Sequence, residues 1–188
     1  MKKYIITGGP HSGKSSILRQ LEKLGVPVLH ETARLLIMED QEKKKADPSF
    51  KIIYPWDDQS LFCRRCHERQ IERERTLTGE FTVMDRSIID NLAYAKVAGI
   101  RLDSRIFGDI EKASYEKKAF FTELLNGYKI DEQRRDSENQ VRAVHKELYK
   151  IYSRLGFNLI TLPVYSEDRN TNIERRTQTL LNEISKEG

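Results

Sequence analysis

The stretch Gly8-Gly9-Pro10-His11-Ser12-Gly13-Lys14-Ser15 decides the fold, because it matches the pattern G-x-x-x-x-G-K-[ST] at every fixed position. It lies between an apolar run at 3–7, which predicts a β-strand, and a run at 13–24 with apolar residues on one side, which predicts an α-helix. Glycines let successive backbone N–H groups turn toward an anion, and the helix N-terminus adds a positive partial charge. The sequence therefore predicts a phosphate-binding loop directly after the first strand.

The residues of this loop are expected to bind the phosphates of a nucleoside triphosphate, ATP or GTP, together with Mg²⁺. Lys14 would bridge the β- and γ-phosphates, and the hydroxyl of Ser15 would hold Mg²⁺. His11 is expected to contribute its backbone only. The expected nucleotide-binding residues are Gly8, Gly9, Pro10, His11, Ser12, Gly13, Lys14, Ser15 and Ser16.

The rest of the chain alternates short β-like runs with helical runs, which is typical of an α/β domain with a parallel sheet. Further strands are expected at 26–29, 81–84, 119–121 and 157–162, and further helices at about 87–97, from about 103, from the capping box at 137–140, and after Ser166 as N-cap. We therefore predict one domain over 1–188, a P-loop NTPase three-layer sandwich with a five-stranded parallel sheet.

Two segments depart from this alternation. Residues 32–79 are predicted to be helical at both ends, with a looser stretch at 43–55, and to cover the acceptor side of the site. Residues 126–136 are polar and contain Arg134 and Arg135, and we predict that they form a small lid. Its arginines would meet the charge of a transferred phosphoryl group and help to exclude water. The alternative is a pair of solvated loop arginines.

Two carboxylates follow predicted strands, at the sheet edge where parallel strands meet a ligand. Asp85 is expected to hold Mg²⁺ through water, or else only to cap the next helix. Glu31 is expected to take the proton of an attacking hydroxyl, or else only to favour the N-terminus of the next helix. Arg86 is expected to bind phosphate oxygens. The expected catalytic residues are Lys14, Glu31, Asp85, Arg86, Arg134 and Arg135, and the expected metal-binding residues are Ser15 and Asp85.

The composition narrows the choice of partners. The formal net charge of +4 comes from 33 basic and 29 acidic residues, a surplus too small to favour a nucleic acid. No apolar run approaches the roughly 20 residues that span a bilayer. Cys63 and Cys66 fit buried thiols in a reducing compartment. We expect a cytoplasmic protein, and the sequence does not specify its oligomeric state.

With these residues in place, the chain resembles the NadR-like AAA-type P-loop family, named after the nicotinamide-riboside kinase domain of a bacterial NAD regulator. The resemblance rests on residues 7–15, Glu31-Thr32-Ala33-Arg34, residues 84–95 and the pair Arg134-Arg135. The step Asp85-Arg86-Ser87 also looks like the acid-Arg-Ser step of deoxynucleoside kinases. That likeness implies that Glu31 serves as the base and that Arg86 meets phosphate.

The residues and the resemblance together favour a kinase that moves the γ-phosphoryl group of ATP to a hydroxyl of a small, nucleoside-like molecule. The alternative is an NTPase or switch that hydrolyses its nucleotide slowly and acts through a protein or lipid partner. The sequence contains no N-K-x-D string of the kind with which GTPases read guanine. Neither interpretation identifies the acceptor.

Overall fold

Five short apolar runs form one parallel sheet in the residues that the structure describes, 1–126 and 137–186 of a computed structural model. The strands are β1 (Lys2–Thr7), β2 (Val28–Leu29), β3 (Phe81–Asp85), β4 (Lys118–Thr122) and β5 (Asn158–Leu162). Their order is β2-β3-β1-β4-β5, and each neighbouring pair is parallel. The predicted sheet is confirmed, with β1 at its centre.

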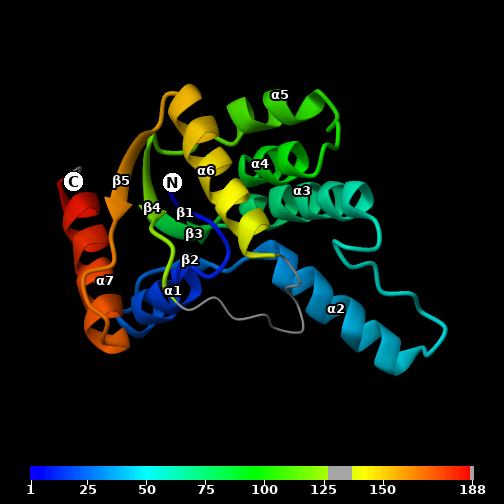
Figure 1. Cartoon of the computed structure of the whole chain (residues 1–188), viewed down its shortest axis with the longest axis horizontal. Helices are drawn as coiled ribbons and strands as arrows, with labels where there is room; N and C mark the ends of the chain where they lie inside the picture. The colour runs from blue at the N-terminus through cyan, green and yellow to red at the C-terminus, as the bar shows by residue number, and fades with distance from the viewer. Residues whose placement is uncertain (127–136, 187–188) are drawn as a thin grey trace.

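Helices cover both faces of the sheet, which makes the three layers of the prediction (Figure 1). They are α1 (Lys14–Lys23), α2 (Thr32–Ala46), α3 (Gln59–Arg75), α4 (Asp90–Val97), α5 (Arg105–Lys112), α6 (Glu138–Arg154) and α7 (Arg169–Ser185). Because strand side chains alternate, Tyr4 and Ile6 pack into a core with α1 and α7, whereas Ile5 packs into a second core with α4 and α6. This burial fixes β1, and with it the start of the loop at Gly8.

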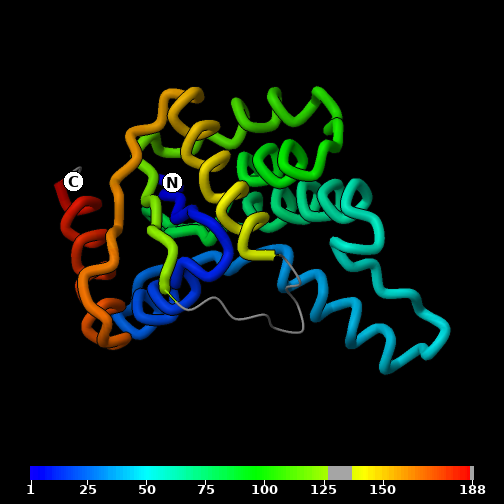
Figure 2. Tube along the Cα trace, viewed as in Figure 1, coloured from blue at the N-terminus to red at the C-terminus, as the bar shows by residue number. Residues whose placement is uncertain are grey.

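The predicted helical segment between β2 and β3 is confirmed as the two helices α2 and α3. Figure 2 shows α2 extending away from the sheet, while α3 returns beside α4. Residues 43–46 form the last turn of α2 and are not part of a looser stretch as predicted. Lysines at 43–45 suit the negative C-terminal end of a helix, and the helix ends before Pro48.

Other helix ends differ from the prediction for local reasons. The helix expected from 87 begins at Asp90, because Asp90 accepts the backbone N–H of Ser87 and closes a turn first. The N-cap of the last helix is Asp168, which accepts from the N–H of Thr171, and not Ser166. The capping box of Ser137 and Gln140 is confirmed.

The predicted lid falls outside the part that can be described, since residues 127–136, including Arg134 and Arg135, are not among the described residues. In the remaining chain, no helix is long and apolar enough to cross a membrane.

Candidate active site

The phosphate loop begins at the carboxyl end of β1 and ends at the N-terminus of α1. Gly8 has a φ of 137°, and a Cβ there would lie 2.5 Å from Thr122 Oγ1. Gly13 has a φ of 86° and is the N-cap of α1. No side chain caps α1, and its first turn contains no acidic residue. The N-terminus of α1 therefore has no acidic side chain in its first turn that would compete with an anionic ligand.

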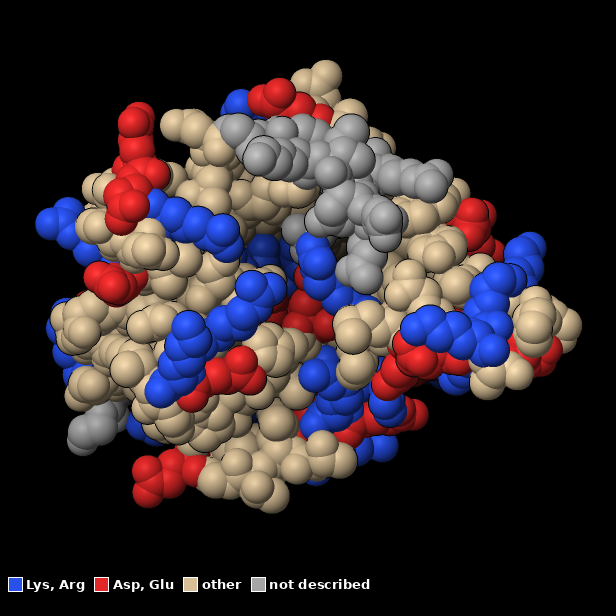
Figure 3. All heavy atoms as spheres, turned by 90° about the horizontal axis from the view of Figure 1, so that it is seen from below, with Lys and Arg blue, Asp and Glu red and all other residues tan. Residues whose placement is uncertain are grey.

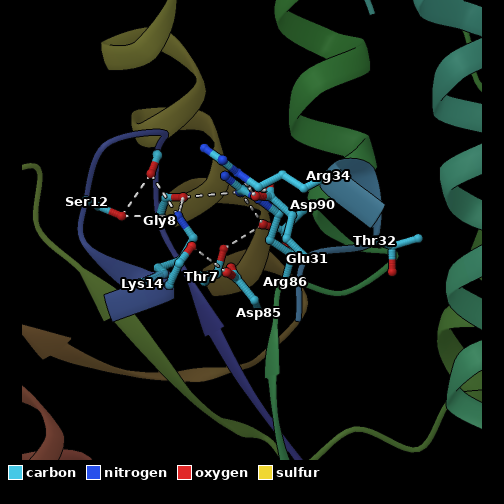
Figure 4. A network of polar contacts seen from close by, with 12 residues as sticks. Thr7, Gly8, Ser12, Lys14, Glu31, Thr32, Arg34, Asp85, Arg86 and Asp90 are labelled. Carbon is cyan, nitrogen blue, oxygen red and sulfur yellow. Dashed lines mark hydrogen bonds and ion pairs between the residues drawn. The ribbon is translucent and has the colours of Figure 1, made fainter. Parts of the chain in front are cut away.

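Lys14 is folded back onto its own loop. Its Nζ donates to Gly8 O and Gly9 O, both at 2.9 Å, and lies 3.2 Å from Ser12 Oγ (Figure 4). The side chain is buried, so the ammonium group is already held at the centre of the loop. Phosphate oxygens entering the loop would replace these carbonyl acceptors with charge-assisted hydrogen bonds.

Ser15 and Asp85 lie side by side at the mouth of the loop. Ser15 Oγ donates to Asp85 Oδ2 at 3.3 Å, and Asp85 is buried at the end of β3. A hydroxyl and a carboxylate are hard oxygen ligands, and Mg²⁺ is usually held by one or two such groups together with phosphate and water. No cluster of three or more His, Cys, Asp or Glu residues capable of holding a metal occurs in the described chain. The donor set therefore fits Mg²⁺ bound together with a nucleotide.

Glu31 and Arg86 form an ion pair at the carboxyl ends of neighbouring strands β2 and β3. Arg86 Nε donates to Glu31 Oε1 at 2.8 Å, and both residues are buried. The second carboxylate oxygen of Glu31 faces Arg34 Nε at 3.3 Å. The sheet thus brings together two residues that lie 55 positions apart in the chain, as the sequence predicts.

Arg86 is also held by Asp90, a second buried carboxylate. Its Nη1 donates to Asp90 Oδ1 at 2.9 Å, and its guanidinium carbon lies 5.2 Å from the centroid of the Tyr94 ring. Burial alone disfavours the charged guanidinium, but Tyr94, Glu31 and Asp90 outweigh it and raise the pKa of Arg86 well above its ordinary value. Its Nη2 is buried and has no hydrogen-bond partner among the described residues. A fixed, charged donor therefore remains for a ligand.

Asp90 is the centre of this network, and the sequence analysis did not identify it. Thr7 Oγ1 donates to its Oδ1 at 2.9 Å, and Tyr152 OH donates to its Oδ2 at 2.7 Å. The Tyr152 hydroxyl also lies 2.8 Å from Ser87 Oγ. Asp90 thereby joins β1, α6 and the turn after β3 in one buried set of hydrogen bonds. Figure 4 shows Asp90 beside Arg86 and Glu31. In the sequence, Asp90 lies within the stretch 84–95 that carries the family resemblance, and this position could have indicated its importance.

A cavity of about 240 Å³ opens beside Glu31 and Arg86. Figure 3 shows this face of the molecule hollowed, with acidic side chains at the bottom of the hollow and lysines and arginines around it. The cavity walls come mainly from α2, α3 and α4, and they combine a polar end with an apolar side. The polar end includes Glu31, Arg34, Arg86, Asp90 and Asn91, and the apolar side includes Ile37, Trp56, Phe62, Cys63 and Cys66.

Comparisons with known proteins agree with this geometry. A family model described as an AAA domain matches residues 3–176. The chain belongs to this AAA-domain family. A comparison with curated protein sequences finds no match.

Solved structures with the fold of this AAA-domain chain include several kinases. Deoxyadenosine kinase from M. mycoides superposes with a TM-score of 0.61 at 13% identity, covering 99% of this chain and 100% of that one. Thymidylate kinase from Ehrlichia chaffeensis gives a TM-score of 0.62 at 14% identity, covering 98% and 100%. NadR protein in complex with NR gives 0.61 at 17% identity, covering 95% of this chain and 48% of NadR. The predicted fold and the family resemblance are confirmed.

The structure of this AAA-domain protein places most predicted site residues together. Lys14, Glu31, Asp85 and Arg86 surround one region at the carboxyl edge of the sheet (Figure 4), and Ser15 joins them through its hydrogen bond to Asp85. Ser16 lies in the first turn of α1, Pro10 lines the cavity, and His11 adopts a φ of 59° within the loop. Cys63 and Cys66 are free and buried as predicted, and burial raises the pKa of Cys63 to about 11. The roles of these residues remain predictions.

His145 on α6 contacts the phosphate loop and was also missed from the sequence. The backbone N–H of Gly9 donates to its Nδ1 at 3.1 Å, so the imidazole must be unprotonated at that atom. Burial, and after it the charge of Lys14, lower the pKa of His145 from 6.5 to about 4. The loop is therefore held against α6 by a neutral histidine.

The stability of the protein is expected to fall as the pH is lowered from 6.5 toward 4. The pKa of His145 is lower in the folded than in the unfolded chain, so the unfolded chain binds a proton first and is favoured by acid. The stabilisation is complete above pH 6.5 and is lost as the pH falls from 6.5 to about 4.

Denaturant unfolding at several pH values measures this effect. The free energy of unfolding should fall less with pH in His145→Gln than in wild-type protein, because glutamine keeps an acceptor but does not titrate. His30→Gln, at an exposed histidine, is the control. Equal losses in wild-type protein and His145→Gln would refute the assignment.

Proposed function

We propose that this protein is a Mg²⁺- and ATP-dependent phosphotransferase that moves the γ-phosphoryl group of ATP to a hydroxyl of a small, nucleoside-like molecule. The observation that carries the proposal is the buried Glu31–Arg86 pair, which faces a cavity beside the phosphate loop. A protein that only binds and hydrolyses nucleotide needs the loop but does not need a second pocket beside it. The kinases of similar fold support the same interpretation at the level of reaction class.

Each residue has a role that its position supports. The loop amides and Lys14 would bind the β- and γ-phosphates, while Ser15 and Asp85 would hold Mg²⁺, which neutralises charge on the phosphate oxygens. Arg86 would turn its buried Nη2 toward the transferred group. Glu31 would accept the proton of the acceptor hydroxyl as that oxygen attacks phosphorus. Arg134 and Arg135, in the predicted lid, would add charge stabilisation as the site closes.

The shape of the cavity supports an acceptor with a flat ring and a hydroxyl group. Its apolar side suits a ring, and its polar end places a hydroxyl near Glu31. Tyr54 and Trp56 stack on each other with ring centroids 4.7 Å apart, and Trp56 lines the cavity. The kinases of deoxyadenosine and thymidylate, and NadR in complex with NR, are similar in fold. A nucleoside-like acceptor in the cytoplasm, where ATP is plentiful, is therefore our proposal.

The test is a release assay with purified protein, Mg²⁺ and either ATP or GTP. The nucleoside diphosphate is measured without an acceptor and with a panel of nucleosides and related metabolites. We expect one acceptor to raise ADP release about tenfold or more, with the phosphorylated acceptor visible by mass spectrometry. Slow release that no acceptor changes would contradict the kinase proposal. It would favour instead the nucleotide-hydrolysing switch, and the search would turn to protein or lipid partners.

A further inference from the structure

Arg176, on the last helix, is among the most deeply buried side chains described, although it is an arginine. Only 1% of the residue is exposed. Its guanidinium group donates to three backbone carbonyls: Nη1 to Ser12 O at 2.7 Å, Nε to Pro163 O at 2.8 Å, and Nη2 to Glu123 O at 3.1 Å. One side chain thereby joins the phosphate loop to the segments that follow β4 and β5.

The described residues supply Arg176 with no ion pair. Glu123 is the acid whose charge acts on it most, but the carboxylate of Glu123 accepts the N–H of Val164 and makes no salt bridge with the guanidinium. An arginine remains charged in proteins, and a buried charge without a counter-charge is costly. Anionic phosphates in the adjacent loop would add counter-charge to that of Glu123.

Through its contact with Ser12 O, the charge of Arg176 can act on the phosphate loop. Ser12 O and the N–H of Gly13 belong to the same peptide unit, so a cation on the carbonyl makes the N–H a stronger donor. Gly13 is the N-cap of α1, at the positive end of the helix where an anion is favoured. The approach is close, because a Cβ on Gly13 would lie 3.4 Å from Arg176 Nη1.

We propose that Arg176 is a positioning residue for the nucleotide phosphates, which acts through the Ser12–Gly13 peptide by polarising a phosphate-binding amide and by bracing the loop. This inference rests on the nucleotide-binding part of the proposed function and not on the identity of the acceptor. It assigns Arg176 no contact with the nucleotide. Its effect is expected on the affinity for phosphates, with or without a base attached.

The adjacent Arg175 provides a matched control, since it is exposed and lies over the ring of Tyr165 at 6.0 Å. The variants are Arg176→Met, Arg176→Lys and Arg175→Met, each checked by circular dichroism and thermal melting. Mg²⁺-ATP and inorganic tripolyphosphate are titrated by calorimetry. We expect Arg176→Met to weaken both ligands about tenfold or more, the scale of one charge-assisted hydrogen bond. Arg176→Lys, which keeps the charge, should recover part of the loss, and Arg175→Met should bind like wild-type protein.

Several results would overturn the inference. Equal affinities of Arg176→Met and Arg175→Met would do so, as would a loss confined to ATP and absent for tripolyphosphate. An equal loss in Arg176→Met and Arg176→Lys would leave only the bracing and would refute the polarisation of the Ser12–Gly13 peptide, and with it the inference. If Arg176→Met does not fold, Arg176→Gln takes its place as the neutral variant. Failure of the wild-type protein to bind either ligand would refute the proposed function itself.

Discussion

Replacing Lys14 with alanine is expected to weaken the binding of Mg²⁺-ATP about 100-fold or more. Lys14 Nζ lies at the centre of the loop, where it donates to Gly8 O and Gly9 O. On nucleotide binding it would exchange these carbonyls for two phosphate oxygens, and each charge-assisted hydrogen bond contributes about 1.5–3 kcal/mol. Two such contacts correspond to a loss of roughly 100-fold at the least.

Calorimetric titration with Mg²⁺-ATP measures the effect. Lys23→Ala, at the exposed C-terminal end of the same helix, is the control for losing one lysine charge from α1 and should leave the affinity unchanged. Because the unliganded loop also depends on Lys14, both variants should be compared by thermal melting before titration. An affinity for Lys14→Ala within about threefold of wild type would show that the loop does not bind the triphosphate as proposed.

Replacing Glu31 with glutamine is expected to lower kcat about 100- to 10,000-fold in the presence of the acceptor, the usual contribution of a general base. The glutamine side chain still offers Arg86 a carbonyl oxygen in place of Glu31 Oε1, so the ion pair becomes a hydrogen bond from the charged guanidinium to a neutral acceptor, and the fold is kept. The amide cannot take the proton of the hydroxyl. Nucleotide affinity should change little, since the substitution leaves the loop and Lys14 as they are.

Initial rates measured with the identified acceptor, together with the affinity for Mg²⁺-ATP, separate the two effects. The control is Glu39→Gln on α2, the helix that follows Glu31, where the carboxylate pairs with Arg69 near the surface. That variant should keep full activity. A kcat for Glu31→Gln close to the wild-type value would mean that the base is another group, and Glu31 would then serve only to hold Arg86.

The positions of the strands and the phosphate loop could be predicted because they depend on local sequence, whereas the order of the strands in the sheet was not predicted. The motif at 8–15 lies directly after an apolar strand, and Glu31 and Asp85 each come at the end of another strand. Parallel pairing then places both carboxylates at the same edge of the sheet, independently of the length and structure of the segments between the strands. The stacking of helices on both faces follows from strands that are apolar on both sides.

The residues that were missed depend on contacts between distant segments. Tyr152 reaches Asp90 from 62 positions away, and Arg176 reaches Ser12 from 164 positions away. Arg176 is one of two adjacent arginines, and its spacing from Ile173 and Leu180 places it on the inward face of its helix, but nothing local indicates its contact with Ser12. The same holds for His145, whose neutral state depends on burial and on Lys14.

The neighbouring positions of β2 and β3 in the sheet determine how the cavity wall could be changed. The chain leaves the sheet at β2 and returns at β3 next to it, so α2 and α3 form an excursion with both ends anchored in neighbouring strands. The loop, its lysine and Asp85 lie outside that excursion, whereas much of the cavity wall lies within it. Replacement of this one segment would therefore change much of the proposed acceptor pocket and leave the phosphate loop, Lys14 and Asp85 in place.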